Sequence, residues 1–390
     1  MRRILILALL FTPNIAYVAS KHCADCVQGS LFAQTSTPEV LHTPSATVEV
    51  GLLNGVPYRI DVPSGWNHSL IVYFHGYSLH TYGFKASDRT NGLLQPFLDR
   101  HFALIQSAYS QGGWAIKQAS PETEALRLYF LKTYGQPNET YVTGFSMGGL
   151  LTSITLEQNP APYIGGVDFC GAVGPTIESF NRRFAQRAAF DYLFPGIMPP
   201  LVPSPPDFDE TPAILAKIRT ALDANPTAAE QMRSLMALKN EADVVNDVAY
   251  WTFVVTDLQR RSGGNPFDNR NVIYTGAGST AADAALNTHV ARYAADPHAR
   301  EYLIHHYSPT GNLGRPMLAV HTLYDALIPP STLAFYEHEV EAAGAGEKLA
   351  WQFVPTEGHC NFSPENVGHA FDELLRWTHD GPRPAPGEVP

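Results

Sequence analysis

The stretch YVTGFSMGG at residues 141–149 indicates the class of fold. Its first half is rich in β-branched and aromatic residues, which is typical of a strand, and apolar residues recur after it at helical spacing. Between the two lies the pattern Gly-x-Ser-x-Gly, centred on Ser146. Glycines on both sides of a serine let a strand turn sharply into a helix, which holds the hydroxyl clear of the sheet. The stretch therefore predicts Ser146 as a nucleophile, and a glycine turn with an incidental serine is the alternative.

Predicted strands alternate with predicted helices on both sides of this turn. Alternation of this kind indicates an α/β fold with a mostly parallel sheet and right-handed crossovers. The signal Asn54-Gly55 between the first two strands predicts a hairpin. The strands are expected at 47–53, 57–62, 70–74, 102–108, 141–145, 165–171, 315–321 and 349–354, and the helices at 121–134, 150–156, 332–343 and 366–377.

The alternation stops between residues 175 and 312. This region has proline-rich loops and amphipathic helical patterns, such as those at 213–222 and 228–238, and strand patterning resumes after it. We interpret it as an inserted, mainly helical cap. The predicted organisation is a signal peptide at 1–20, a flexible leader at 21–46, an α/β core at 47–174 and 313–380, the cap at 175–312, and a disordered tail at 381–390.

Charge and hydropathy limit the partners and the location. The net charge of −11 gives no basic footprint for nucleic acid, and we expect no nucleic-acid partner. Arg2 and Arg3 precede an apolar run at 4–11 and small residues up to Ser20, which predicts a secretory signal peptide, with an uncleaved anchor as the alternative. No later run reaches about 18 apolar residues, so we expect no stable membrane insertion. The predicted location is secreted or periplasmic, and the oligomeric state stays open.

Four cysteines in an exported chain suggest two disulfides, for which three connectivities are possible. Cys23 and Cys26 form a C-x-x-C in the leader, without the second pair or the strand–helix context that zinc or redox chemistry needs. Cys170 ends the strand that follows the Ser146 helix, and Cys360 directly follows His359. Both should lie on the same rim of the sheet. Our hypothesis is a Cys170–Cys360 disulfide that holds the His359 loop.

A serine hydroxyl is a poor nucleophile unless a base takes its proton and a third group orients that base. Asp325 and His359 each follow a predicted strand of the resumed sheet, at the edge where open α/β sheets place their sites. Asp168 and Asp283 are weaker candidates for the acid, because neither follows a late strand. No spacing of histidine, cysteine and carboxylate residues typical of a metal site is found, and we expect neither a metal nor an organic cofactor.

From about residue 47 to residue 377, the chain resembles the α/β-hydrolase superfamily. The matching motifs are GFSMG at 144–148, HG at 75–76, LYDALIP at 323–329, with Thr322 where glycine is common, and EGH at 357–359. The resemblance implies that Ser146 attacks a carbonyl, that His359 carries the proton and that Asp325 orients His359. It also implies an oxyanion hole made by the backbone N–H groups of Met147 and Tyr77.

Narrower resemblances concern the substrate. One glycine followed by an aromatic, as at Tyr77, is shared with some polyester and short-chain esterases, and the Tyr77 and Trp114 rings are candidates to line a substrate pocket, with packing as the alternative. Tannase and fungal feruloyl-esterase proteins have a cysteine after the histidine, as Cys360 is here, but another before the serine, where this chain has Phe145.

The resemblance implies a serine hydrolase of carboxylic esters, small or polymeric, that works through an acyl-enzyme, and the signal peptide predicts that it is secreted. One alternative is a serine peptidase of the prolyl-oligopeptidase type, which usually carries an N-terminal propeller, for which residues 1–46 leave no room. Another is a non-catalytic binding protein with the hydrolase fold. Such proteins typically lack a member of the triad, whereas here all three positions are filled.

Overall fold

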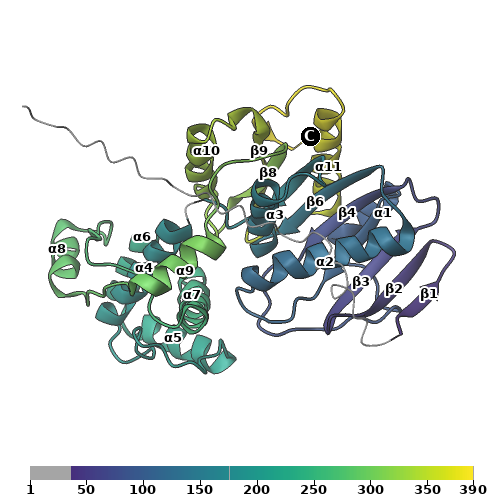
Figure 1. The fold of residues 1–390 in the computed structure, drawn as a ribbon. Coiled ribbons are helices and arrows are strands. Elements are labelled where there is room, and N and C mark those ends of the chain that lie inside the picture. Colours follow the sequence, from purple (N-terminus) through teal and green to yellow (C-terminus); the bar gives the residue numbers. More distant parts are fainter. Residues whose placement is uncertain (1–36, 175, 390) are drawn as a thin grey trace, which may run out of the picture.

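The computed structural model describes residues 37–174 and 176–389. Within these residues, ten strands form one sheet in the order β1-β2-β3-β5-β4-β6-β7-β8-β9-β10 (Figure 1). Pairs from β5–β4 onward are parallel, and the first three pairs are antiparallel. The strands are β1 (Glu39–His42), β2 (Ala46–Leu53), β3 (Val56–Pro63), β4 (Ser69–Phe74), β5 (Ala103–Ser107), β6 (Glu139–Phe145), β7 (Gly165–Phe169), β8 (Met317–Tyr324), β9 (Leu349–Glu357) and β10 (Gly387–Glu388).

Helices cover both faces of the sheet. Side chains alternate along β4: Leu70, Val72 and Phe74 pack with α2 and α3, while Ile71 and Tyr73 pack with α1 and α11. This alternation follows from the two-residue period of a strand, and it explains why β4 is apolar throughout. The core helices are the 3-10 turns η1 (Gly92–Leu94) and η2 (Gly346–Lys348), and α1 (Gln95–Asp99), α2 (Ile116–Tyr134), α3 (Met147–Gln158), α10 (Thr332–Ala342) and α11 (Pro364–Thr378).

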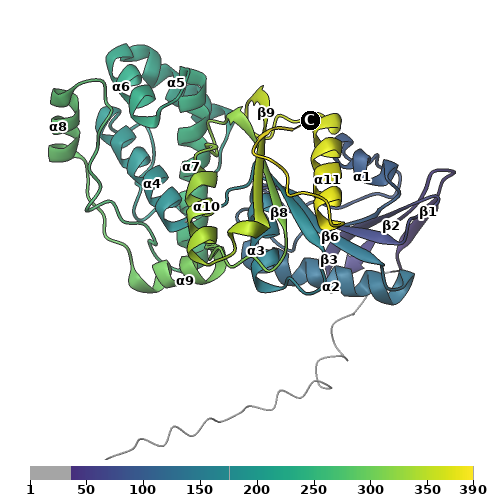
Figure 2. The same cartoon turned by 90° about the horizontal axis from the view of Figure 1, so that it is seen from above.

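The segment between β7 and β8 forms a helical lobe beside the core, at the opposite end of the molecule from β1 (Figures 1 and 2). Its apolar side chains belong to the same continuous hydrophobic cluster as those of α2 and α3, so the lobe is packed on the core. We refer to this lobe as the cap. Its helices are α4 (Thr176–Leu193), α5 (Pro212–Ala224), α6 (Pro226–Met236), α7 (Glu241–Ser262), α8 (Thr280–His289) and α9 (Pro297–Tyr307).

Three sequence expectations about local structure are wrong. The expected flexible leader at 21–46 contains β1, which pairs with β2, and the expected disordered tail at 381–390 contains β10, which pairs with β9. Both are edge strands that depend on pairing with another strand: β2 follows β1 after a short turn, whereas β9 lies further from β10 in the sequence. The buried Val389 side chain adds an apolar contact. The helix expected from residue 121 begins at Ile116, because Ile116 and Ala119 have an apolar core to cover.

The predicted signal peptide, Cys23 and Cys26 lie outside the described residues. Among residues 37–174 and 176–389, no helix combines the length and the apolar character needed to cross a bilayer.

Candidate active site

Ser146 lies at a strained turn between β6 and α3. Its φ of 59° and ψ of −117° belong to a region that side chains other than glycine rarely adopt. The flanking glycines are required by close contacts: a Cβ on Gly144 would lie 2.3 Å from the carbonyl oxygen of Gly148, and one on Gly148 would lie 2.0 Å from that of Phe74. The Ser146 N–H donates to the carbonyl of Phe169 on β7 (3.0 Å). The tight turn that the glycine pattern predicts is therefore present, with the serine at its tip.

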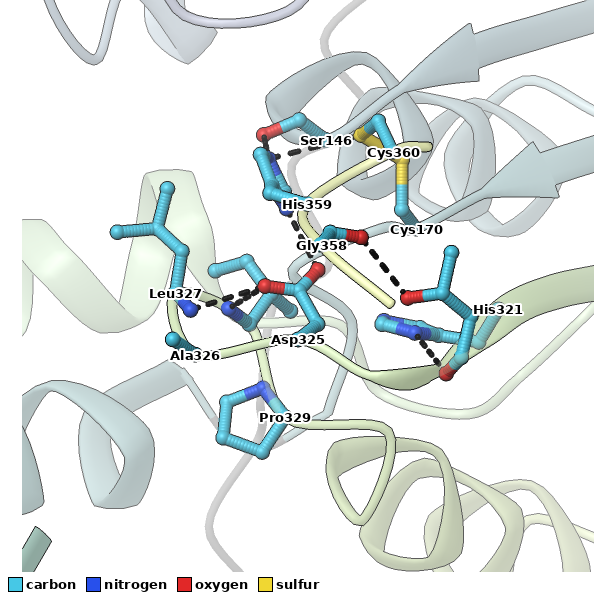
Figure 3. A network of polar contacts seen from close by, with 12 residues as sticks. Ser146, Cys170, His321, Asp325, Ala326, Leu327, Pro329, Gly358, His359 and Cys360 are labelled. Carbon is cyan, nitrogen blue, oxygen red and sulfur yellow. Dashed lines mark hydrogen bonds and ion pairs between the residues drawn. A yellow bond between two sulfur atoms is a disulfide. The ribbon is translucent and has the colours of Figure 1, made fainter. Parts of the chain in front are cut away.

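Ser146, His359 and Asp325 form one hydrogen-bonded chain (Figure 3). His359 Nε2 lies 2.8 Å from Ser146 Oγ, and His359 Nδ1 lies 2.6 Å from Asp325 Oδ2. Because the carboxylate oxygen can only accept, Nδ1 carries the proton, and Nε2 is left to accept from the serine hydroxyl. Ser146 and Asp325 are buried, while the His359 side chain is 24% exposed. The arrangement can transfer a proton between the hydroxyl and the imidazole.

A cap residue holds the turn that carries Asp325. The Oδ1 atom of Asp325 accepts from the backbone N–H groups of Leu327 and Ile328, both at 2.9 Å (Figure 3). Arg183 on α4 donates from Nη2 to the carbonyls of Ala326 (3.0 Å) and Leu327 (2.8 Å).

Arg183 is also half of a buried ion pair within the cap. Its Nη1 pairs with Asp247 Oδ2 on α7 at 2.7 Å, and both side chains are buried. Burial raises the pKa of Asp247 to about 7, although Arg183 opposes this shift. Sequence reasoning missed Arg183, since one arginine on an amphipathic helix carries no local signal of its partners.

The loop that carries His359 is held on both sides. Thr322 Oγ1 donates to the carbonyl of Gly358 (3.1 Å), and the Gly358 N–H donates to the carbonyl of Tyr324 (2.7 Å). On the other side, Cys360 forms a disulfide with Cys170, which follows β7, with Cα atoms 5.4 Å apart. The structure thus contains the proposed Cys170–Cys360 bridge. The sequence signalled Thr322 only as a departure from the usual glycine.

The candidate oxyanion donors flank Ser146. The Met147 N–H is the first of α3, where backbone donors lack a partner within the helix. The loop that leads to Tyr77 passes close to the turn, since a Cβ on Gly76 would lie 3.5 Å from that of Ser146. His75 anchors this loop: its Nδ1 lies 2.6 Å from the carbonyl oxygen of Gly76, and its ring stacks on Tyr109 at 3.8 Å. Burial lowers the pKa of His75 to about 4, which keeps the ring neutral.

The two aromatic candidates for the substrate pocket differ in exposure. Trp114 is fully buried, with its ring 5.4 Å from that of Phe180 on α4, so the structure favours its alternative role in packing. The sequence marked Trp114 as a loop residue, and the cap covers that loop. Tyr77 is half-buried, and its ring contacts Tyr250 (5.3 Å) and Phe253 (5.7 Å) of α7.

No protein-family model and no curated protein sequence matches the chain. Among solved structures, acylaminoacyl peptidase from Pyrococcus horikoshii is 13% identical with a TM-score of 0.44, covering 87% of this chain and 42% of its own. An esterase from Pyrococcus furiosus is 11% identical with a TM-score of 0.45, covering 88% and 92%, and Est1E from Butyrivibrio proteoclasticus is 11% identical with a TM-score of 0.39, covering 88% and 99%. The chain spans about two fifths of the peptidase's length.

At these identities and scores, the similarities carry no inference about activity. The order of the strands and the position of the site residues in this chain show the fold. Eight strands, β2 to β9, lie in the order β2-β3-β5-β4-β6-β7-β8-β9 within the described residues, with a sharp serine turn after β6 and polar side chains after β8 and β9. By this topology, the chain has the α/β-hydrolase fold.

Proposed function

We propose that the protein is a serine hydrolase that cleaves carboxylic esters through an acyl-enzyme intermediate. The supporting observation is the hydrogen-bonded chain Ser146–His359–Asp325, with links of 2.8 Å and 2.6 Å between residues that follow three different strands. A serine hydroxyl, an imidazole and a buried carboxylate in this order are the parts that acyl transfer needs.

The proposed reaction has two half-reactions. Ser146 Oγ bonds to the ester carbonyl carbon while His359 Nε2 takes the hydroxyl proton, and the N–H groups of Met147 and Tyr77 stabilise the negative oxygen. His359 then gives that proton to the alcohol oxygen, the ester C–O bond breaks, and the alcohol leaves. Water repeats the attack with the same base, which releases the acid and restores Ser146. Asp325 stays ionised and stabilises the imidazolium. No step requires a metal or an organic cofactor.

The disulfide supports the proposed location. Disulfides persist in oxidising compartments, so Cys170–Cys360 agrees with export through the signal peptide expected at residues 1–20. We therefore propose a secreted or periplasmic enzyme, with the core at 47–174 and 313–380 and the cap at 175–312. The substrate is a small or polymeric ester.

The test compares Ser146→Ala with a matched variant, Ser153→Ala. Ser153 lies on the same helix, and its hydroxyl donates to the carbonyl of Leu150 (2.8 Å), away from His359. We expect the wild type and Ser153→Ala to hydrolyse 4-nitrophenyl butyrate and to gain one fluorophosphonate adduct by intact mass. Ser146→Ala should do neither, with its thermal midpoint nearly unchanged.

Three results would count against the proposal. Turnover that survives in Ser146→Ala would remove the serine from the mechanism. A wild-type protein that neither labels nor turns over would favour a binding protein with this fold. Faster cleavage of peptide 4-nitroanilides than of esters would favour the peptidase alternative.

A further inference from the structure

A pocket lies at the junction of the cap and the core, lined by segments that adjoin Ser146 and Asp325. Its volume is about 180 Å³. Its walls come from the segments that hold the triad: the Ala172 N–H donates to the carbonyl of Ser146 (3.3 Å), and the Leu327 N–H donates to Asp325 Oδ1. The apolar part of the lining comes from the segment after β7, from α4 and α7 of the cap, from the turn that carries Asp325, which we call the acid turn, and from α10. It includes Ala172, Val173, Phe180, Trp251, Leu327 and Phe335.

The size of the pocket restricts what it can hold. Sites for drug-sized molecules have volumes of roughly 300–1,000 Å³, and an apolar cavity of about 150 Å³ holds one benzene ring. A pocket of about 180 Å³ therefore has room for one ring or a short alkyl chain. The apolar walls favour a group of this kind over a polar one, because burying a polar group without a partner is costly.

Arg182 on α4 gives the pocket a positive charge. Among the described residues, none forms a hydrogen bond or an ion pair with its guanidinium, whereas its neighbours on α4, Arg183 and Arg187, pair with Asp247 and Asp191. Burial and the nearby Arg183 charge lower the pKa of Arg182. Arg182 also lines a second, larger groove of about 870 Å³ on the cap, so it lies where the two cavities meet.

Glu178 lies one helical turn before Arg182 and lines the same two cavities. A glutamate four residues before an arginine can pair with it on a helix, yet the two side chains form no ion pair here. Glu178 therefore leaves the guanidinium open to an outside anion. The chain as a whole carries a net charge of −11, so the positive charge of Arg182 at this pocket is opposite in sign to that of the protein as a whole.

We propose that the pocket and Arg182 form a subsite for an apolar group that ends in a carboxylate. This inference rests on the proposed ester hydrolysis and names its substrate class. The ring or alkyl part of the group fills the pocket, and the carboxylate pairs with Arg182. The group belongs either to the acid, as in monoesters of dicarboxylic acids, or to the alcohol of the ester.

The experiment uses two matched substrate pairs on the full chain. On the acyl side, the 4-nitrophenyl monoester of adipic acid is compared with 4-nitrophenyl hexanoate, which has the same length and no charge. On the alcohol side, 3-carboxyphenyl butyrate is compared with phenyl butyrate. Each pair is measured with the wild type, Arg182→Gln and Glu178→Gln.

We expect Arg182→Gln to lower kcat/KM about tenfold for the charged member of one pair, and to leave its neutral member unchanged. Glu178→Gln should raise kcat/KM for that same substrate, because it removes a negative charge from the pocket wall that repels the substrate's carboxylate. The wild-type preference should weaken as NaCl rises from 0.05 to 0.5 M, since salt screens an exposed pair. If the acyl pair shows the charge effect, Ser179→Phe, which narrows the pocket, should lower kcat/KM for adipate and hexanoate esters more than for acetate esters. If the alcohol pair shows it, Ser179→Phe should lower kcat/KM for the phenyl butyrates more than for ethyl butyrate.

The pair in which Arg182→Gln has a selective effect shows whether the carboxylate belongs to the acid or to the alcohol of the ester. A selective effect in either pair supports the subsite. Equal changes for charged and neutral members, or no change in either pair, would overturn it. A wild type that cleaves none of the four esters and takes no fluorophosphonate label would instead overturn the proposed function, so the two failures can be told apart.

Discussion

Replacing Arg183 with methionine tests whether the cap maintains the candidate active site. The substitution keeps much of the side-chain volume. It removes the pair with Asp247 (2.7 Å) and the hydrogen bonds to the carbonyls of Ala326 (3.0 Å) and Leu327 (2.8 Å), together with a longer hydrogen bond to Gln186 (3.3 Å) and the cation–π contact with Trp251. Removing one partner of a buried ion pair costs about 3–5 kcal/mol of stability. We therefore expect the free energy of unfolding to fall by about that amount at pH 8.

The stability loss should depend on pH. The pKa of Asp247 is already raised to about 7 by burial, and it rises further without the arginine. An acid whose folded pKa is raised adds stability that is present at low pH and lost as pH rises, so the variant should lose less at pH 6 than at pH 8. Urea denaturation at the two pH values measures this difference.

Activity should fall for a separate reason. The turn at 325–328 presents Asp325 to His359, and a misplacement of about 1 Å in a catalytic group can cost about 100-fold. We expect kcat for 4-nitrophenyl butyrate to drop by about that factor, with a smaller change in KM.

Two further variants separate the effects. Arg187→Met is the matched control, because Arg187 is equally buried on α4 but bonds to Thr252, Pro199 and Asp191, away from the triad. Arg187→Met should lower the free energy of unfolding and leave kcat within about twofold of the wild-type value. The double variant Arg183→Met/Asp247→Leu should recover most of the stability, since an apolar pair can replace a buried ion pair, but not kcat. Recovery of both quantities would refute a role for Arg183 in holding the acid turn.

Three other substitutions test the site and its support. Asp325→Asn should lower kcat by about 10⁴ while circular dichroism stays unchanged, and a loss below about tenfold would point to another acid. Replacing both Cys170 and Cys360 with serine should cost about 2–4 kcal/mol in urea denaturation and lower kcat through a looser His359 loop; an unchanged kcat would show that the bonds of Gly358 to Thr322 and Tyr324 hold the loop without the bridge. Burial raises the pKa of Asp168 from 3.8 to about 8. Between about pH 4 and pH 8 the native state therefore binds up to one more proton at Asp168 than the unfolded state, and this group should lower the free energy of unfolding by about 1.4 kcal/mol for each pH unit of increase. Asp168→Asn should flatten that slope between pH 5 and 8, and equal slopes in both proteins would contradict the assignment.

The tight turn at Ser146 could be predicted from the sequence because its cause is local. Gly144 and Gly148 are needed by contacts within one strand–turn–helix unit, and the pattern that encodes them spans five residues. Asp325 and His359 could be placed because each directly follows an apolar strand, and parallel strands end at one edge of the sheet. The proximity of Cys170 and Cys360 could be predicted for the same reason, because Cys170 directly follows β7 and Cys360 directly follows His359 at that edge.

The remaining features depend on contacts with other segments of the chain. Arg183 bonds to a turn 143 residues away, and nothing in its helix indicates that partner. Trp114 lies in a segment with the composition of an exposed loop and is buried only because cap side chains such as Phe180 cover it. β1 and β10 exist through pairing with β2 and β9, and their own residues carry little strand signal.

The Cys170–Cys360 bridge has a topological consequence for the cap. It joins residues 190 positions apart, so every cap helix lies within a single covalent ring that starts and ends at the core. A peptide bond cut by a protease in an exposed cap loop leaves the two halves of the core linked through sulfur. The cap is thus an insertion whose two ends are joined covalently at the core. Its loops can be cut, lengthened or replaced while the segment after β7 and the His359 loop stay linked.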